Sequence, residues 1–131
     1  VYFDKTYCLW IHRLNNKAGN IVKDNLKFFF HTAFGRNQSI TIDLGNVYKL
    51  NYLIIKNRSD ACQDRARALF YVIHNEMTYS KDEALPIITS DKFLEPNGPS
   101  SITSLLGKNG RYLTIFSPIY TALHFSSIKV F

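Results

Sequence analysis

The sequence lacks the features that mark a disulfide scaffold or a membrane-spanning chain. Its only two cysteines are Cys8 and Cys62, so at most one intramolecular disulfide can form and a disulfide-rich fold is excluded. No stretch approaches the ~18 consecutive apolar residues of a transmembrane helix, and no charged start followed by a long apolar run indicates a signal peptide. We therefore expect residues 1–131 to form a single globular domain, which is either a mature protein or, as we favour, a domain excised from a longer protein.

The sequence also has no internal repeat and no segment with a convincing helical period. Aromatic residues, in contrast, make up 15% of the chain, which favours strands or a ligand surface. Ser39 to Leu44 alternates so that Ile40, Ile42 and Leu44 share one face, and Gly45-Asn46 is expected to end this strand in a turn. Further strands are expected at residues 50–56, 68–74, 111–116 and 123–131, with loops and one or two short strands over 75–110. Short strands at this spacing predict an antiparallel sandwich or barrel.

The charged residues are not concentrated in any one part of the chain. The net charge is +6, and the basic residues are spread along the whole chain rather than gathered into a tail or stripe. This distribution is typical of a solvated surface with a general bias toward anionic partners. Nucleic-acid binding is not predicted, because no basic stripe is present.

One polar segment stands apart from this background. Residues 57–67 hold three arginines and two aspartates directly after an apolar run. An arginine presents five donors in a fixed fork, and a neighbouring carboxylate orients it. The cluster is consistent with either a solvated turn, whose ion pairs contribute little, or a binding site.

Several segments of the sequence resemble a known family. Ile40-Thr-Ile-Asp-Leu-Gly45, the strand before Asn57-Arg58 and Gly110-Arg-Tyr-Leu-Thr-Ile-Phe116 are similar to discoidin-like, galactose-binding domains over about residues 18 to 131. The resemblance implies an all-β, antiparallel jelly-roll β-sandwich. Within this superfamily the chain looks like the fucose-binding F-type lectins.

The sugar motif of that family is His, 26 residues, Arg-x-Asp, four residues, then Arg or Lys. Here His31, Arg58, Asp60 and Arg65 stand at all four positions. The resemblance implies that both arginines and the imidazole donate to sugar oxygens, while Asp60 braces an arginine. It also implies an apolar platform beside His31, for which the candidates are Phe28, Phe29, Phe30, Phe34 and Cys62.

The chain departs from the family in its cysteines. Many members have two adjacent cysteines after Arg-x-Asp that form a small disulfide platform, whereas this chain has Ala61-Cys62. The platform is therefore expected to be weakened or replaced. Cys62 is either free or bonded to Cys8, and the sequence does not decide between these alternatives.

A second departure concerns calcium. The family's calcium loop aligns with Asn20, Lys23, Asp24 and Asn25, which puts an ammonium at an acidic ligand position, and Ser127 falls where a Glu is expected. Hard cations need several oxygen ligands. We therefore expect no calcium or other cofactor, and we expect the Lys23 ammonium to occupy the place of the ion.

Three functions follow from these features. The first is a non-enzymatic lectin for a fucosylated glycan or glycoprotein, outside the cell or on its surface, a location with which the sequons Asn37-Gln-Ser39 and Asn57-Arg-Ser59 are compatible. The second is a discoidin-like module that binds protein or phospholipid and no longer binds sugar. The third, an enzyme using Cys62 with His31 or His74, has no flanking signature to support it.

Overall fold

The computed structural model describes residues 30–58, 63–95 and 100–131, with Phe30 and His31 described in their backbone only. Six strands make up most of this part of the chain, and its only helices are three short 3-10 helices. The strands are β1 (Phe30–His31), β2 (Gln38–Asn57), β3 (Phe70–His74), β4 (Leu85–Pro86), β5 (Ser101–Ser117) and β6 (His124–Val130). The 3-10 helices are η3 (Gln63–Arg65), η4 (Lys81–Glu83) and η5 (Asp91–Leu94).

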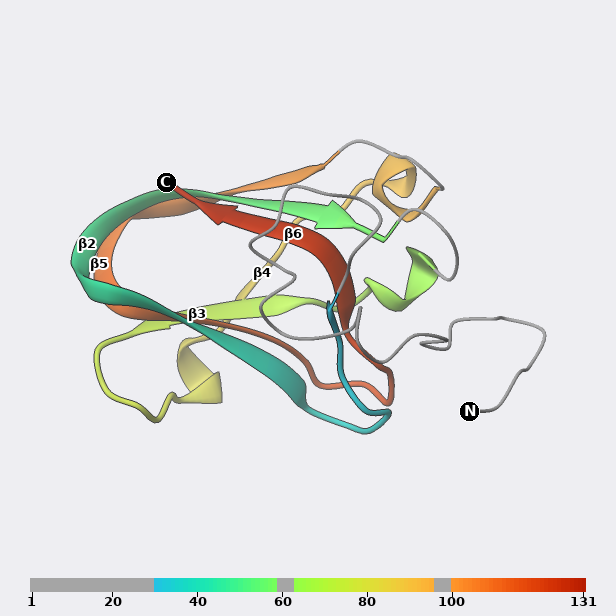
Figure 1. Ribbon diagram of the computed structural model, residues 1–131, viewed down its shortest axis with the longest axis horizontal. Helices are drawn as coiled ribbons and strands as arrows, with labels where there is room; N and C mark the ends of the chain where they lie inside the picture. The colour runs from blue at the N-terminus through green and yellow to red at the C-terminus, as the bar shows by residue number, and fades with distance from the viewer. Residues whose placement is uncertain (1–29, 59–62, 96–99) are drawn as a thin grey trace.

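The fold is built around β2 and β5, which pair along nearly their whole length and bend together. The first half of β2 pairs with residues 112–117 of β5, and its second half pairs with residues 101–110, with a register shift between Asp43 and Tyr48. Gly45, at φ +84°, lies within this shift. Figure 1 shows the bend at one end of the molecule, from which the paired strands continue into an upper and a lower layer. Two strands therefore contribute to both layers.

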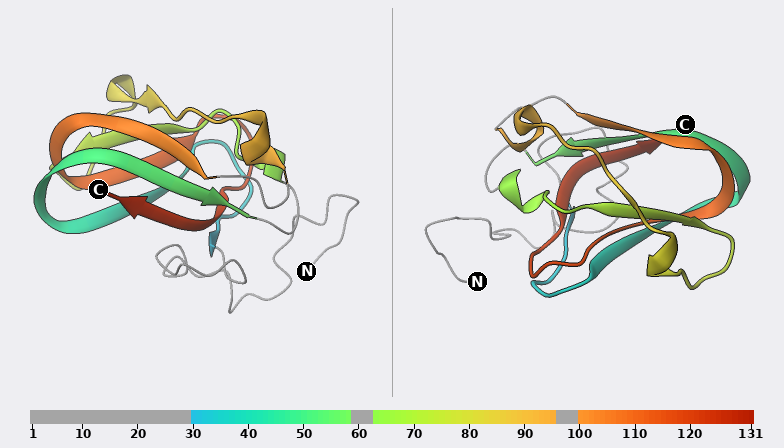
Figure 2. Two further views of the ribbon diagram at one scale, coloured as in Figure 1. Left: turned by 90° about the horizontal axis from the view of Figure 1, so that it is seen from above. Right: turned by 180° about the vertical axis from the view of Figure 1, so that it is seen from behind.

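The other strands extend these layers. The order of the whole sheet is β1-β6-β2-β5-β3-β4, and all pairs are antiparallel. β3 and β4 continue the lower layer beside β5, while β6 pairs with the second half of β2. Figure 2 shows the resulting two-layered sandwich from above and from behind. The predicted all-β, antiparallel jelly-roll sandwich is confirmed.

The core lies between the layers and follows the predicted alternation. Ile40, Ile42 and Leu44 pack against it from one face of β2, as predicted. Leu53, Leu113 and other fully buried residues fill its centre. Burying a side chain of this size contributes roughly 1.5–3 kcal/mol, so this apolar interior is what holds the layers together.

Two predicted strand ends are wrong. Gly45-Asn46 does not end a strand, because the partner strand β5 bends with β2 and the ladder resumes at Tyr48. Likewise, the strand predicted to begin at residue 111 begins at Ser101, and it accommodates Leu106 and Gly107 at φ values of 61° and 66°. Glycine adopts positive φ without a Cβ clash, so here it permits a bulge within a continuing ladder rather than a turn.

Candidate functional site

The register of the sheet brings the two distant parts of the predicted motif together. Phe125 of β6 is paired on one side with Phe30 of β1 and on the other with Asn57 of β2. Because β1 and β2 are both antiparallel to β6, they run in the same direction. His31 and Arg58 therefore follow the same row, on either side of β6. Two strand spacings separate their backbones, roughly 10 Å, which is a span that a monosaccharide and two side chains can bridge.

Asn57 fixes the backbone from which Arg58 projects. Its side-chain Nδ2 donates to the carbonyls of Gln63, at 3.1 Å, and Phe93, at 3.0 Å. Its Oδ1 accepts from the backbone N–H of Arg58 at 2.8 Å. One amide thus ties the end of β2 to η3 and to η5. Because its nitrogen donates to two carbonyls, the Asn57 side chain has a structural role here.

The two arginines of the motif lie in different surroundings. Arg58 is only 3% exposed, whereas Arg65, in η3, is half-buried. Lone buried charges are costly, so a guanidinium buried to this degree requires acceptors around it. Arg58 is consequently suited to the floor of a site, and Arg65 to its rim.

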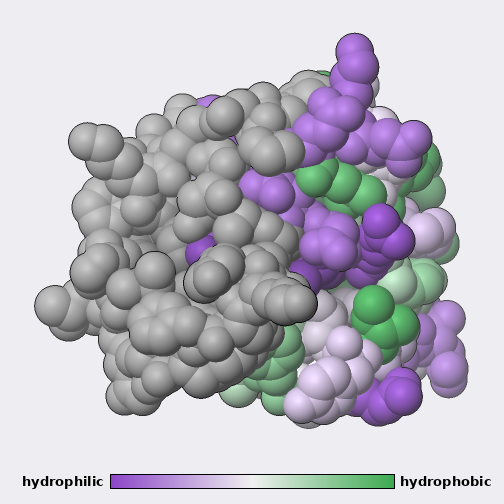
Figure 3. All heavy atoms as spheres, turned by 90° about the vertical axis from the view of Figure 1, so that its right-hand side faces the viewer, coloured by the Kyte–Doolittle hydropathy of each residue, from purple (hydrophilic) through white to green (hydrophobic). Residues whose placement is uncertain are grey.

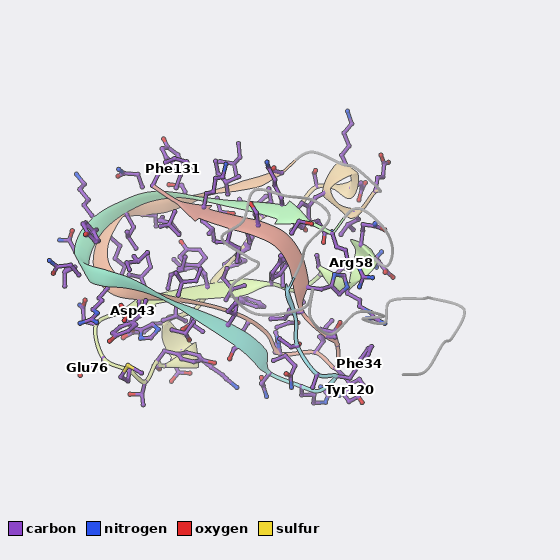
Figure 4. All side chains as sticks on the ribbon, viewed as in Figure 1. Phe34, Asp43, Arg58, Glu76, Tyr120 and Phe131 are labelled. Carbon is purple, nitrogen blue, oxygen red and sulfur yellow. The ribbon has the colours of Figure 1, made fainter. Side chains whose placement is uncertain are left out.

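Arg65 lies against an aromatic pair. Its Cζ is 4.4 Å from the centroid of the Phe34 ring, within cation–π range. Phe34 in turn stacks on Tyr120, with ring centroids 6.4 Å apart and an interplanar angle of 24°. Backbone hydrogen bonds between Gly35 and Thr121, at 3.0 and 3.1 Å, hold the two loops together. We call Phe34, Arg65 and Tyr120 the aromatic rim; Figure 4 shows Phe34 and Tyr120 side by side at the same end of the molecule as Arg58.

Sequence reasoning identified Phe34 and Arg65 but missed Tyr120. Tyr120 is 67% exposed, and it lies between the strands predicted at residues 111–116 and 123–131. A large aromatic residue in a short proline-containing loop was the available signal. Figure 3 views this end of the molecule and shows hydrophobic residues set among hydrophilic ones over its described part.

Several predicted site residues lie outside the described residues. These are Asp60, Cys62, Phe28 and Phe29, together with Cys8 and the calcium-loop positions Asn20, Lys23, Asp24 and Asn25. The side chains of His31 and Phe30 are likewise not described. Ser127, which stands where the family has a calcium-binding Glu, is described: it is 2% exposed in β6. Within the described ranges, no group of three acidic, histidine or cysteine side chains could hold a metal ion.

His74 and His124 both lie in strands with buried side chains. His74 Nδ1 bonds the carbonyl of Glu76 at 2.6 Å, and its Nε2 bonds the hydroxyl of Thr114 at 2.8 Å. Glu76 and Arg58 are at opposite ends of the molecule (Figure 4). His74 is therefore a structural residue remote from the predicted motif.

The opposite end carries an ion pair that the sequence did not reveal. Arg111 donates from Nε to Asp43 Oδ1 at 2.8 Å and from Nη2 to Oδ2 at 3.0 Å. These bonds from Arg111, together with one from the backbone N–H of Gly45, lower the pKa of Asp43 to about 2. The same pairing raises the pKa of Arg111. Asp43 belonged to the strand signature used for the resemblance, and its role here is to tie β2 to β5 beside the bend.

No family model and no curated protein sequence matches the chain. Solved structures do. The lectin domain of lectinolysin, complexed with Lewis B antigen, has a TM-score of 0.75 at 19% identity, over 91% of this chain and 86% of that one. A fucose-binding module of Streptococcus pneumoniae has a TM-score of 0.71 at 17% identity, over 89% and 83% of the two chains.

A fucolectin from striped bass (Morone saxatilis) serum has a TM-score of 0.73 at 21% identity, over 92% of this chain and 43% of that one. At such identities the likeness establishes the fold. The chain has the β-sandwich fold found in these fucose-binding lectin modules, as predicted. In the described part of the chain, no helix is long and apolar enough to cross a membrane.

Proposed function

We propose that this chain is a non-enzymatic carbohydrate-binding domain that recognises fucose or a fucosylated glycan. The observation that supports the proposal is the spacing of His31, Arg58, Asp60 and Arg65 in the sequence, together with a sheet register in which His31 of β1 and Arg58, directly after β2, follow the same row. A motif of fixed spacing is weak support alone. It gains weight where the fold brings its distant parts to one end.

The chemistry of the motif suits a deoxysugar. Two guanidinium groups and one imidazole offer donors to the ring oxygen and to vicinal hydroxyls, and the Asp60 carboxylate accepts from an arginine. The 6-methyl group of fucose needs an apolar surface. The Phe34 and Tyr120 rings provide one beside Arg65, and Phe30 and Cys62 remain candidates for the rest of it.

This arrangement predicts weak binding to a single sugar, because each hydroxyl bound is one withdrawn from water. Useful avidity would come from further domains or copies of the chain. We accordingly propose that residues 1–131 act as one domain of a longer protein, outside the cell or on its surface. The partner is a fucosylated glycan or glycoprotein, and neither calcium nor another cofactor takes part.

The decisive experiment is a glycan array followed by calorimetric titration with free fucose. The expected result is binding to fucosylated glycans, with a loss of affinity of roughly tenfold or more in Arg65→Ala, since each charge-assisted hydrogen bond is worth about 1.5–3 kcal/mol. Arg67→Ala is the matched control, because Arg67 is an exposed neighbour outside the motif.

A blank array with a folded wild-type protein would refute the lectin proposal. Sedimentation with anionic liposomes would then test the discoidin-like alternative of a phospholipid-binding module. Arg58→Ala is less suitable as the first variant. Its side chain is buried, so truncation would also affect stability.

A further inference from the structure

A pocket lies at the end of the sandwich opposite Arg58. It has a volume of about 570 Å³ and is formed by the loop after β3, by η4 and by the bend of β5. Small-molecule sites usually occupy roughly 300–1,000 Å³. Figure 4 shows Glu76, one of its lining residues, far from Arg58 across the molecule. The pocket is therefore separate from the fucose site proposed above.

The loop that forms this pocket is held in place by its own hydrogen bonds. Asn75 Oδ1 accepts from the backbone N–H of Arg111 at 3.2 Å, and the carbonyl of Glu76 bonds His74 Nδ1. Ser80 Oγ caps η4 by accepting from the backbone N–H of Asp82 at 3.3 Å. Such a pocket is preorganised, so little conformational entropy would be lost when a ligand binds.

Aromatic rings form one side of the pocket. The imidazole of His74 stacks on Tyr112 at 5.4 Å and lies 5.6 Å from the ring of Tyr79. Tyr79 also packs against Phe116 at 5.9 Å, which anchors it to the sheet. A fixed aromatic ring gives the C–H face of a sugar an apolar surface to pack on.

Polar side chains of both kinds surround the rings. Glu76 and Glu83 offer carboxylate acceptors, while Lys108 and Asn109 offer donors. Within the described residues, no hydrogen bond or ion pair engages the side chains of Glu83, Lys108 or Asn109. Sugar hydroxyls both donate and accept, so they match this mixed set. Two carboxylates against one ammonium leave the pocket negative, which disfavours carboxylated or sulfated sugars.

We propose that this pocket, lined by Tyr79, Glu83 and Asn109 among others, is a second carbohydrate site that binds a neutral hexose. The domain then carries two sugar sites at opposite ends. One polypeptide would bridge two glycans, or two branches of one glycan, without forming an oligomer. This site does not depend on the fucose motif, and each can exist without the other.

The test is a two-dimensional amide NMR titration of the full chain with the methyl glycosides of galactose, glucose and N-acetylglucosamine. Concentrations should reach roughly 50 mM, because single sugars bind weakly. The expected result is a saturable shift of amides around Asn75, Tyr79 and Asn109 with at least one of these glycosides. Glu83→Ala and Asn109→Ala should each weaken it about tenfold, as expected for the loss of one strong hydrogen bond.

The controls separate this site from the fucose motif and from general charge effects. Asp82→Ala removes one exposed carboxylate from the same 3-10 helix as Glu83, but Asp82 does not line the pocket, so binding should be unchanged. Arg65→Ala should also leave it unchanged. The proposal is overturned if none of the three glycosides shifts these amides, if shifts occur only near Arg65, or if Asp82→Ala weakens binding as much as Glu83→Ala.

Discussion

The hydroxyl of Thr114 links β5 to both of its neighbouring strands, β2 and β3, in the lower layer of the sandwich. Thr114 lies in β5 with no exposed surface, and its Oγ1 is 2.7 Å from Thr41 Oγ1 and 2.8 Å from His74 Nε2. Thr114→Val keeps the shape of the side chain but removes both bonds. Thr41 is exposed and can bond water instead. His74 is only 8% exposed, so its Nε2 would lose its partner without replacement.

The expected loss of stability follows from this difference in exposure between Thr41 and His74. Leaving one buried polar group unsatisfied costs about 1–3 kcal/mol, whereas the bond to exposed Thr41 contributes little net. We therefore expect Thr114→Val to lower the free energy of unfolding by about 2 kcal/mol. In a domain of this size, that corresponds to a fall in Tm of roughly 6–10 °C.

Urea unfolding followed by fluorescence measures this change as a shift of the midpoint at constant m-value. Thr114→Ser retains the hydroxyl and should recover most of the loss. The double variant Thr114→Val, His74→Phe removes both partners and should be more stable than the sum of the single variants predicts. A Thr114→Val protein within 0.5 kcal/mol of wild type would refute the assignment of the cost to His74.

Three further outcomes are expected. Because Arg111 depresses the pKa of Asp43, the stability that this carboxylate contributes is present above pH 3.8 and is lost as the pH falls through about 2. The Tm difference between wild type and Asp43→Asn should therefore be larger at pH 5 than at pH 2, and an unchanged difference would contradict the pairing. A double-mutant cycle of Phe34→Leu and Arg65→Gln should give a coupling of about 0.5–1 kcal/mol by urea unfolding, as the 4.4 Å cation–π contact predicts, and additive effects would argue against it. Calcium should leave the Tm of wild type unchanged, because Lys23 stands at an acidic ligand position of the family's loop, and a rise in Tm with added calcium would show that the ion binds the native state.

The sequence predicted the faces of the sheet better than the limits of its strands. Alternation at Ile40 and Ile42 fixed which side of β2 faces the core, since side chains of a strand point to opposite faces in turn. A turn and a bulge, however, share the same glycine signal. Gly45 was expected to end a strand and residues 75–110 to form mainly loops, but pairing between β2 and β5 continues past both Gly45 and Gly107.

The candidate site was predicted unevenly for a similar reason. The spacing from His31 to Arg58 is a property of the sequence, so it could be identified directly. Tyr120 reaches the aromatic rim only because Gly35 pairs with Thr121, 86 residues later in the chain. Asn109 and Tyr79 likewise line one pocket although they lie on segments distant in the sequence. Contacts between loops distant in sequence follow from the topology, which local patterns do not encode.

The shared bend of β2 and β5 also has a consequence for how the chain reaches its native state. Ser39 pairs with Phe116 and Ile55 with Ser101, so the central ladder joins residues far apart in sequence. Ladders of this kind form late and slowly, over milliseconds to seconds. During synthesis at about 5–20 residues per second, β2 must wait several seconds for β5 to emerge. The apolar residues of β2 are interrupted by three charged ones, Asp43, Lys49 and Lys56. Charged side chains in a strand that has not yet found its partner oppose pairing with other chains.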